Sequence, residues 1–225
     1  MKILMIGDIH GQFGALNKLI NQHKNKIDMI IQCGDFGYWP KDCGKWHTDV
    51  YGKVKVFQIT VKNHGIPFYF CDGNHEDHES LLLLGNNEIL PNVFYMKRGS
   101  VLEVNNKNIL FMGGAFSIDR AWRILGKSYF LEETIGQKDV LNLPDQDIDI
   151  VVSHTAPNEF IIPLNLKKEH DPSRDALSYI LNRYQPKRWY FAHFHAHFTG
   201  LENNCKWTCY SCSGDTQKWW EVITI

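Results

Sequence analysis

Five short apolar runs are spaced along the chain, and each is followed closely by polar side chains that can bind a metal ion. Each run has the length and the aliphatic or aromatic content of a buried β-strand. Segments with helical periodicity separate several of the runs. The pattern predicts an α/β fold, in which functional side chains gather at the carboxyl ends of strands. The runs cover residues 2–7, 28–32, 66–71, 148–153 and 189–192, and the polar residues after them are Asp8, His10, Asp35, Asn74, His154, His193 and His195.

Two of these polar groups contain a pair of residues that are two positions apart, Asp8 with His10 and His193 with His195. In an extended backbone, residues i and i+2 project to the same side, so each pair can face one ion. A glycine precedes the polar residue after the second and third runs, which suits a sharp turn with unusual backbone angles. The spacing therefore favours one shared site.

Each of these residues has a simpler explanation when it is taken alone. An Asp or Asn before a helix is usually an N-cap, an Asp after Gly is usually a turn residue, and a single His after a strand is usually a hydrogen-bonded polar residue. Independent caps and turns have no reason to follow five strands and to supply four imidazoles and two carboxylates. We therefore interpret the seven residues as a metal site. Its ligands suit Mn²⁺, Fe, Zn²⁺ or Ni²⁺ better than Ca²⁺.

In chain order, these residues form a pattern that resembles the signature of the calcineurin-like metallophosphoesterase superfamily. Residues 34–39, 113–120 and 153–157 further resemble small single-domain members of bacterial and phage type. The resemblance implies an α/β (α+β) fold, a four-layer sandwich of two mixed β-sheets flanked by helices, with residues 1–225 as a single domain. The motifs that carry it are Asp8-x-His10, Gly34-Asp35, Gly73-Asn74-His75-Glu76, His154 and His193-x-His195.

The superfamily pattern also implies two divalent metal ions that share Asp35 as a bridging carboxylate. Two cations about 3.5–4 Å apart hold a phosphate, lower the pKa of a bridging water and stabilise in-line attack. The implied enzyme is a dinuclear phosphoesterase whose nucleophile is a hydroxide between the metals. One ion would be held by Asp8, His10, Asp35 and His195, and the other by Asp35, Asn74, His154 and His193.

Three further residues are candidates for contact with the substrate. His75 matches the general acid of the superfamily, which protonates the leaving alkoxide. Its alternative role is a hydrogen bond to a phosphate oxygen without proton transfer. Arg120 and Arg123 lie in a stretch that looks too polar for the core, and either guanidinium is a candidate for binding the phosphate. Solvated surface arginines are the commoner case.

The charge balance and the cysteines bear on partners and location. Lys and Arg number 24 against 25 for Asp and Glu, so the chain lacks the basic field of proteins that bind duplex nucleic acid strongly. No apolar stretch reaches the roughly 18 residues of a membrane span, and the expected location is the cytoplasm. There the six cysteines are expected to be reduced thiols. The alternative is zinc at Cys205, Cys209 and Cys212, but a structural zinc site normally has four ligands.

The remaining periodicity predicts the scaffold. Helices are expected around residues 16–23 and 176–184, and a third over 46–61 from the spacing of Trp46, Val50, Val54, Phe57 and Val61. Short strands are expected at 93–96, 101–104 and 109–112, with a hairpin turn at 105–108, and again between 197 and 225. Glu132 and Glu133 are expected to begin a helix, where the dipole favours carboxylates.

The expected substrate is a small phosphomonoester or phosphodiester, with a nucleotide among the candidates. Tyr38, Trp39 and Trp46 either form an apolar wall on which a base stacks or pack a loop against the body. Protein phosphatase activity is disfavoured, because Phe36 follows Gly34-Asp35 where those enzymes continue with Asp-Arg-Gly. The alternative function is a non-catalytic protein-interaction scaffold on the same fold, which the complete ligand set argues against.

Overall fold

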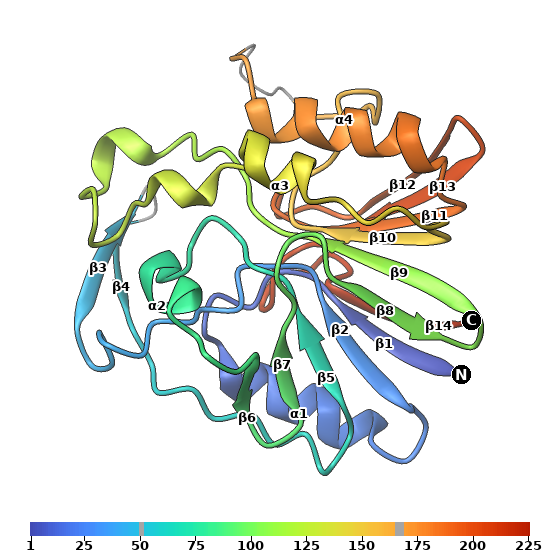
Figure 1. The fold of residues 1–225 in the computed structure, drawn as a ribbon. Helices are drawn as coiled ribbons and strands as arrows, with labels where there is room; N and C mark the ends of the chain where they lie inside the picture. Colours follow the sequence, from blue (N-terminus) through green and yellow to red (C-terminus); the bar gives the residue numbers. More distant parts are fainter. Residues whose placement is uncertain (50–51, 165–168) are drawn as a thin grey trace.

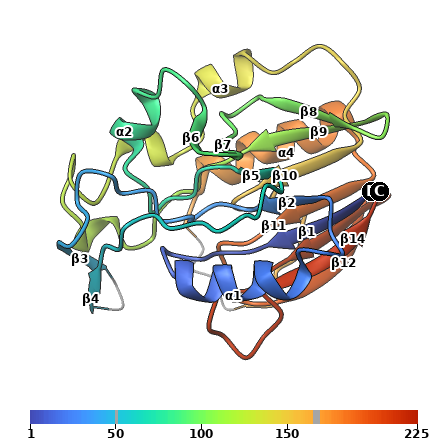
Figure 2. The same cartoon turned by 90° about the horizontal axis from the view of Figure 1, so that it is seen from below.

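The computed structural model describes residues 1–49, 52–164 and 169–225. Two six-stranded sheets lie face to face in the middle of the molecule (Figure 1). Helix α1 (Phe13–His23) covers the outer face of the first sheet, and helix α4 (Pro172–Tyr184) covers the outer face of the second (Figures 1 and 2). The order of layers is helix, sheet, sheet, helix, which confirms the predicted four-layer sandwich.

The first sheet has four parallel strands in its centre and one antiparallel strand at each edge. Strand β1 (Lys2–Ile6) is buried on both faces: Ile3 and Met5 contact the second sheet, while Leu4 and Ile6 contact α1. This explains why the central strands read as continuous apolar runs. In spatial order the strands are β14 (Trp220–Thr224), β1 (Lys2–Ile6), β2 (Met29–Gln32), β5 (Phe68–Phe70), β7 (Val93–Tyr95) and β6 (Glu88–Leu90).

The second sheet repeats this plan, with four parallel central strands and antiparallel edges. The predicted hairpin turn is confirmed between its strands β8 (Val101–Val104) and β9 (Lys107–Met112). Asn105 and Asn106 both have a positive φ there, as two-residue hairpin turns of type I′ require. The spatial order is β12 (Phe198–Glu202), β13 (Cys205–Cys209), β11 (Arg188–Phe191), β10 (Ile150–Ser153), β9 (Lys107–Met112) and β8 (Val101–Val104).

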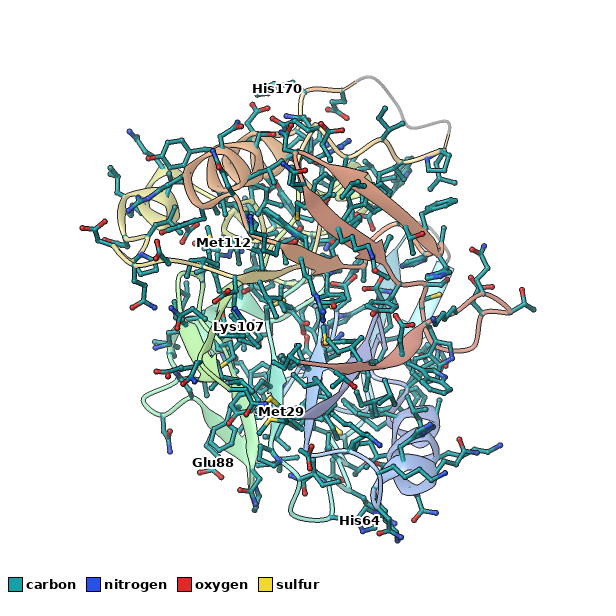
Figure 3. The ribbon with its side chains drawn as sticks, turned by 90° about the vertical axis from the view of Figure 1, so that its right-hand side faces the viewer. Met29, His64, Glu88, Lys107, Met112 and His170 are labelled. Atoms are coloured by element: carbon teal, nitrogen blue, oxygen red, sulfur yellow. The ribbon has the colours of Figure 1, made fainter. Side chains whose placement is uncertain are left out.

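Apolar side chains fill the space between the two sheets. Ile31 of β2 packs in one buried cluster with Phe111 of β9 and Val152 of β10. In the side view, side chains occupy the interior, and His64 and His170 lie at opposite ends of the molecule (Figure 3). Because the sheets are held face to face, the loops after the central strands of both sheets can meet at one edge of the sandwich.

The helices expected around residues 16–23 and 176–184 are confirmed. The second begins at a side-chain cap, because the Asp171 carboxylate accepts hydrogen bonds from the backbone N–H groups of Ser173 (2.9 Å) and Arg174 (3.2 Å). None of the helices in the described residues combines the length and the hydrophobicity of a bilayer-spanning segment. The shorter helices are α2 (His78–Leu82), α3 (Gln137–Leu141) and the 3₁₀ turns η1 (Arg120–Trp122) and η2 (Leu131–Glu133).

The helix predicted over residues 46–61 is wrong. Strands β3 (Trp46–Asp49) and β4 (Gly52–Lys55) form an antiparallel hairpin instead, and Val50 lies outside the described residues. Trp46 and Phe57 are 62% and 54% exposed, so the apolar positions that suggested a helix do not form one buried stripe. A segment rich in Val and Thr favours extended structure when no core contact holds it in a helix.

Candidate metal centre

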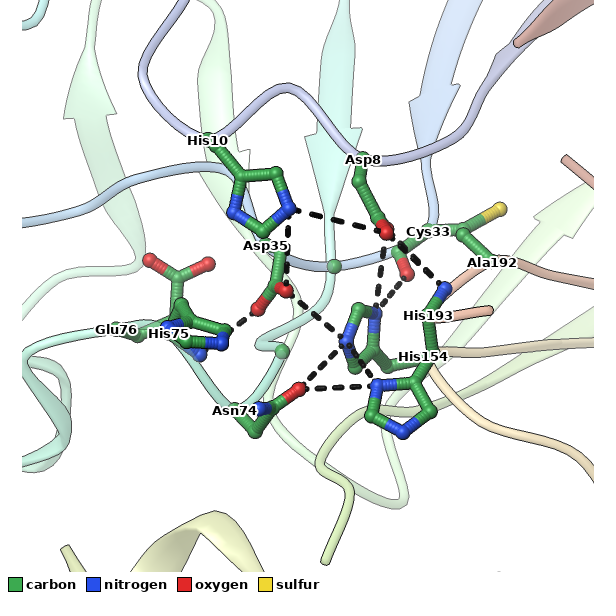
Figure 4. Close-up of polar contacts among 12 residues, drawn as sticks. Asp8, His10, Cys33, Asp35, Asn74, His75, Glu76, His154, Ala192 and His193 are labelled. Carbon is green, nitrogen blue, oxygen red and sulfur yellow. Dashed lines mark hydrogen bonds and ion pairs between the residues drawn. The ribbon is translucent and has the colours of Figure 1, made fainter. Parts of the chain in front are cut away.

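The seven side chains predicted as metal ligands lie together, in loops that follow β1, β2 and β5 of the first sheet and β10 and β11 of the second. Figure 4 labels all of them except His195. In the first group, His195 Nε2 is 3.3 Å from Asp8 Oδ2 and 3.0 Å from His10 Nε2. Asp8, His10 and His195 each supply one ligand atom, and these atoms lie within 4.8 Å of one another. Nitrogen atoms of two imidazoles come this close when a proton or a cation lies between them.

The second group lies beside the first and contains Asn74, His154 and His193. Asn74 Oδ1 is 3.0 Å from His154 Nε2 and 3.1 Å from His193 Nδ1. The two imidazole nitrogens are 3.3 Å apart, so three ligand atoms of different residues point at one small volume. These are the imidazole and amide donors expected at a first-row metal ion.

Asp35 lies between the two groups. Its Oδ2 atom is 3.7 Å from His10 Nε2 on one side and 3.4 Å from His154 Nε2 on the other. Its Oδ1 atom accepts a hydrogen bond from the backbone N–H of His75 (2.8 Å), which fixes the carboxylate. Burial raises the pKa of Asp35, but the nearby His154, His75 and His10 outweigh burial and hold that pKa well below its usual range.

The buried charges require a compensating cation. Asp8 and Asp35 are 0% and 1% exposed, and an unpaired buried carboxylate is costly. His154 is as deeply buried, and although burial lowers its pKa, Asp35 and Asp8 raise that pKa to about 10. This pKa favours a proton on His154, whose positive charge balances part of the negative charge of the two carboxylates. His154 Nδ1 donates to the Cys33 carbonyl (2.8 Å), which leaves Nε2 on the side of the other ligands.

The backbone at the site is unusual. His10, Asp35, His193 and His195 have φ between 43° and 69°, a region that non-glycine residues seldom adopt and that collects at functional sites. Gly34 has the positive φ (+93°) that the sequence predicted. Gly73 has no such φ, so the predicted angle is wrong there. A Cβ at Gly73 would collide with the Asp35 carboxylate, and the glycine provides space instead.

Glu76 holds the loop that follows Asp35, a role that sequence reasoning missed. This fully buried carboxylate accepts hydrogen bonds from the backbone N–H groups of Phe36 (2.7 Å), Gly37 (3.1 Å) and Tyr38 (2.6 Å). The sequence signal was its place in the third motif, three positions after Gly73. Glu76 therefore fixes the path of the chain next to Asp35.

We expect Glu76→Gln to destabilise the metal-free protein by about 1–3 kcal/mol, because an amide N–H₂ would face at least one backbone N–H donor. Urea denaturation followed by circular dichroism would measure this loss. The matched control is Glu79→Gln, because Glu79 lies three residues further on and pairs with Lys41 at the surface. Equal stability of the two variants would contradict the assigned role.

A cavity of about 520 Å³ opens beside the two ligand groups. His75 lines it opposite His10, with the two ring centroids 5.5 Å apart. Burial lowers the pKa of His75 to about 3 against the raising effect of Asp35, so this imidazole is neutral in the free site. The lining residues are His10, Gly11, Gln12, Gly37, Trp39, His47, Lys55, Val56, Phe57, His75, Arg123, Ser128 and His195.

The two arginines predicted to bind phosphate are held by carboxylates. Arg120 pairs with Glu169 at the surface and is not among the described residues that line the cavity. Arg123 does line it, but Arg123 is only 8% exposed, so the expectation of a stretch too polar for the core is wrong for this residue, whereas Ile118 and Trp122 of the same stretch are 60% and 59% exposed. Its guanidinium lies 3.0 Å from Asp119 and 2.7 Å from Glu133.

Glu133 is the second residue that sequence reasoning missed. It ends a 3₁₀ turn rather than beginning an α-helix, and it is fully buried. Burial raises the pKa of Glu133 to about 7, while Arg123 and the Ser117 hydroxyl oppose this by donating to the carboxylate. The sequence suggested only a helix start at Glu132 and Glu133, because the local pattern does not show which side chains Glu133 contacts.

The cysteines take no part in the candidate ligand groups found in the described residues. All six are free thiols, and Cys205 and Cys209 are buried within β13, where their side chains pack in the core. Among the three aromatics considered beside the site, Trp39 lines the cavity. Its indole N–H donates to the His75 carbonyl (2.9 Å), so Trp39 also packs the loop.

Known proteins resemble this chain in sequence and in fold. The chain is 26% identical over 242 residues to the lariat debranching enzyme of Schizosaccharomyces pombe, covering 89% of this chain and 49% of that protein. It is 23% identical over 234 residues to the lariat debranching enzyme of Arabidopsis thaliana, covering 88% and 55%. The chain thus spans about half the length of the curated relatives it matches.

The fold is similar to that of the protein TT1561 of Thermus thermophilus, with a TM-score of 0.54 at 12% identity, covering 94% of this chain and 89% of that one. The family model of calcineurin-like phosphoesterases matches residues 1–197 and so includes all seven candidate ligands. The superfamily predicted from the sequence is confirmed: the chain belongs to the calcineurin-like phosphoesterase family.

Proposed function

We propose that this protein is a dinuclear metal-dependent phosphoesterase. The observation that carries the proposal is the position of Asp35 Oδ2, which lies within 3.7 Å of a ligand nitrogen in each of the two groups. Asp8, His10 and His195 would hold one ion with Asp35, and Asn74, His154 and His193 would hold the other. When bound, two divalent ions would supply Lewis acidity and a water of lowered pKa.

His75 is placed to act on the leaving group. It lines the cavity, and its Nε2 atom lies 3.9 Å from the Asp119 carboxylate. The neutral imidazole must gain a proton before it can act as an acid. The negative charge of a bound phosphoester favours this, because it raises the pKa of the imidazole. The backbone N–H of His75 is committed to Asp35, so the ring reaches the substrate from a fixed position.

The cavity fits an organic group attached to the phosphate. At about 520 Å³ it lies in the range of about 300–1,000 Å³ typical of ligand pockets, well above what a phosphate alone needs. Trp39 and Phe57 provide flat apolar walls, and Lys55 provides a positive charge. We therefore propose a nucleotide-like ester as substrate. The names of the relatives, lariat debranching enzymes, favour a phosphodiester over a phosphomonoester.

Hydrolysis of nitrophenyl esters tests the function. Protein stripped with a chelator is expected to be inactive and to regain hydrolysis of bis-nitrophenyl phosphate when Mn²⁺, Zn²⁺ or Ni²⁺ is added. Nitrophenyl phosphate should be the poorer substrate. A nucleoside nitrophenyl phosphate should have a kcat/KM about tenfold higher than the bis ester, because stacking of one base contributes about 1–3 kcal/mol. Failure with every metal and ester would instead favour the non-catalytic scaffold.

A further inference from the structure

The Asn74 side chain can bind a metal through only one of its two ends. The amide oxygen accepts, whereas the amide nitrogen carries two hydrogens and repels a cation. In the structure, Oδ1 faces His154 Nε2 and His193 Nδ1 at 3.0 and 3.1 Å (Figure 4). An amide turned by 180° would fill the same space with the wrong end toward the metal, so something must fix its orientation.

Ser117 contacts the other end of this amide. Asn74 Nδ2 donates to Ser117 Oγ at 3.0 Å, and Ser117 Oγ donates onward to Glu133 Oε2. The hydroxyl has one hydrogen, and because Glu133 receives it, a lone pair is left to face Asn74. Asn74, Ser117 and Glu133 are 3%, 2% and 0% exposed, so water does not compete for these bonds.

Arg123 keeps Glu133 an acceptor. Its Nη1 and Nη2 atoms donate to the two Glu133 oxygens at 2.9 and 2.7 Å, a two-pronged arrangement that favours the ionised carboxylate. Arg123 Nη1 also donates to the backbone carbonyl of Asn74 at 3.0 Å. The Arg123 guanidinium thus holds two parts of this network. One is the Glu133 carboxylate, which orients Ser117, and the other is the backbone of Asn74, whose side chain Ser117 orients.

We propose that Ser117 and Glu133 are positioning residues that fix the Asn74 amide with its oxygen toward the second ligand group. The chain of donors runs one way, from Asn74 through Ser117 to Glu133. A flipped amide would direct its carbonyl oxygen at Ser117 Oγ, whose hydrogen already belongs to Glu133. The inference rests on the proposed dinuclear function, because it concerns the affinity of the second ion.

Metal binding to Ser117→Ala tests the inference directly. We expect titration calorimetry with Mn²⁺ on chelator-stripped protein to show two ions in the unaltered chain. In the variant, the affinity for one of the two ions should fall about 10–100-fold, the usual effect of losing a group that orients a ligand. The control is Ser100→Ala in the loop before β8, which should bind as the unaltered chain does.

A pair of isosteric variants separates the hydroxyl from packing. Ser117→Thr keeps the hydroxyl, and Ser117→Val replaces it with a methyl group in a side chain of the same volume as Thr. The Thr variant should therefore retain the affinity for the second ion, and the Val variant should lose it. An Asn74→Asp background gives a further readout. A carboxylate presents an oxygen whichever way it turns, so Ser117→Ala should weaken the second ion far less there than in the Asn74 background.

These experiments separate the orienting role of Ser117 from the dinuclear function on which it rests. If the unaltered chain binds only one ion, the dinuclear function fails. If it binds two, and Ser117→Ala and Ser117→Val bind both with unchanged affinity, the function stands and the orienting role is overturned. An equal loss in the Asn74→Asp background would also overturn that role, because the effect would then be general packing.

Discussion

Replacing Asp35 with Asn is expected to release both metal ions and to lower kcat by about a thousandfold or more. Asp35 Oδ2 is the atom that faces a ligand in each group, and the substitution removes its charge while keeping its shape. Bound metals supply several kcal/mol of transition-state stabilisation, which corresponds to such a loss. Metal content after dialysis, measured by elemental analysis, and turnover of bis-nitrophenyl phosphate check both parts.

Variants of ligands that belong to only one of the two groups show whether the effect is specific to Asp35. Asp8→Asn and His154→Ala should each weaken mainly one ion, because each residue belongs to only one of the proposed groups. Asp145→Asn is the matched control, since the Asp145 side chain is fully exposed and lies 3.8 Å from the Arg183 guanidinium at the surface. Retention of one tightly held ion by Asp35→Asn would show that Asp35 does not bridge.

Replacing His75 with Ala is expected to slow esters with poor leaving groups by about 10²–10⁴-fold, the usual contribution of a general acid. Nitrophenolate leaves without a proton, so hydrolysis of nitrophenyl esters should change far less. Metal content should stay unchanged, because no His75 ring nitrogen is needed as a ligand in the proposed scheme. Paired rates on an alkyl and a nitrophenyl diester measure the difference.

His170→Ala is the control for this comparison, because the His170 side chain is 77% exposed and lies at one end of the molecule (Figure 3). Equal losses on both esters would reassign His75 to a hydrogen bond with a phosphate oxygen, which stabilises charge in the transition state whatever the leaving group is.

The strands that carry the candidate ligands could be predicted from the sequence because each is a continuous apolar run. Central parallel strands are buried on both faces, so their composition alone marks them. The hairpin at Asn105 and Asn106 was equally readable, since both positions need a positive φ that Asn tolerates. The α1 and α4 helices were marked by the period of their buried faces.

Prediction from the sequence failed where one local pattern is compatible with two structures. Residues 46–61 show apolar spacing that fits a helix, but Trp46 and Phe57 have no core to pack against, and the segment forms a hairpin. From the sequence, Arg123 was expected to bind phosphate or to lie at the surface, and Glu133 was expected at a helix start, because a buried ion pair has no local signature. Their burial depends on each other and on Asn74, which is 49 residues away from Arg123.

The sequence by itself determined which side chains follow which strands, and the period of two in extended backbone made Asp8 and His10 a pair. The family resemblance implied that two sheets pack face to face, but only the tertiary structure showed that this packing brings His10 and His195 within 3.0 Å across 185 residues of chain. The same packing decided that Ser117 and Glu133 meet Asn74. Such contacts arise from burial of apolar faces between layers, a property of the whole fold that no local pattern encodes.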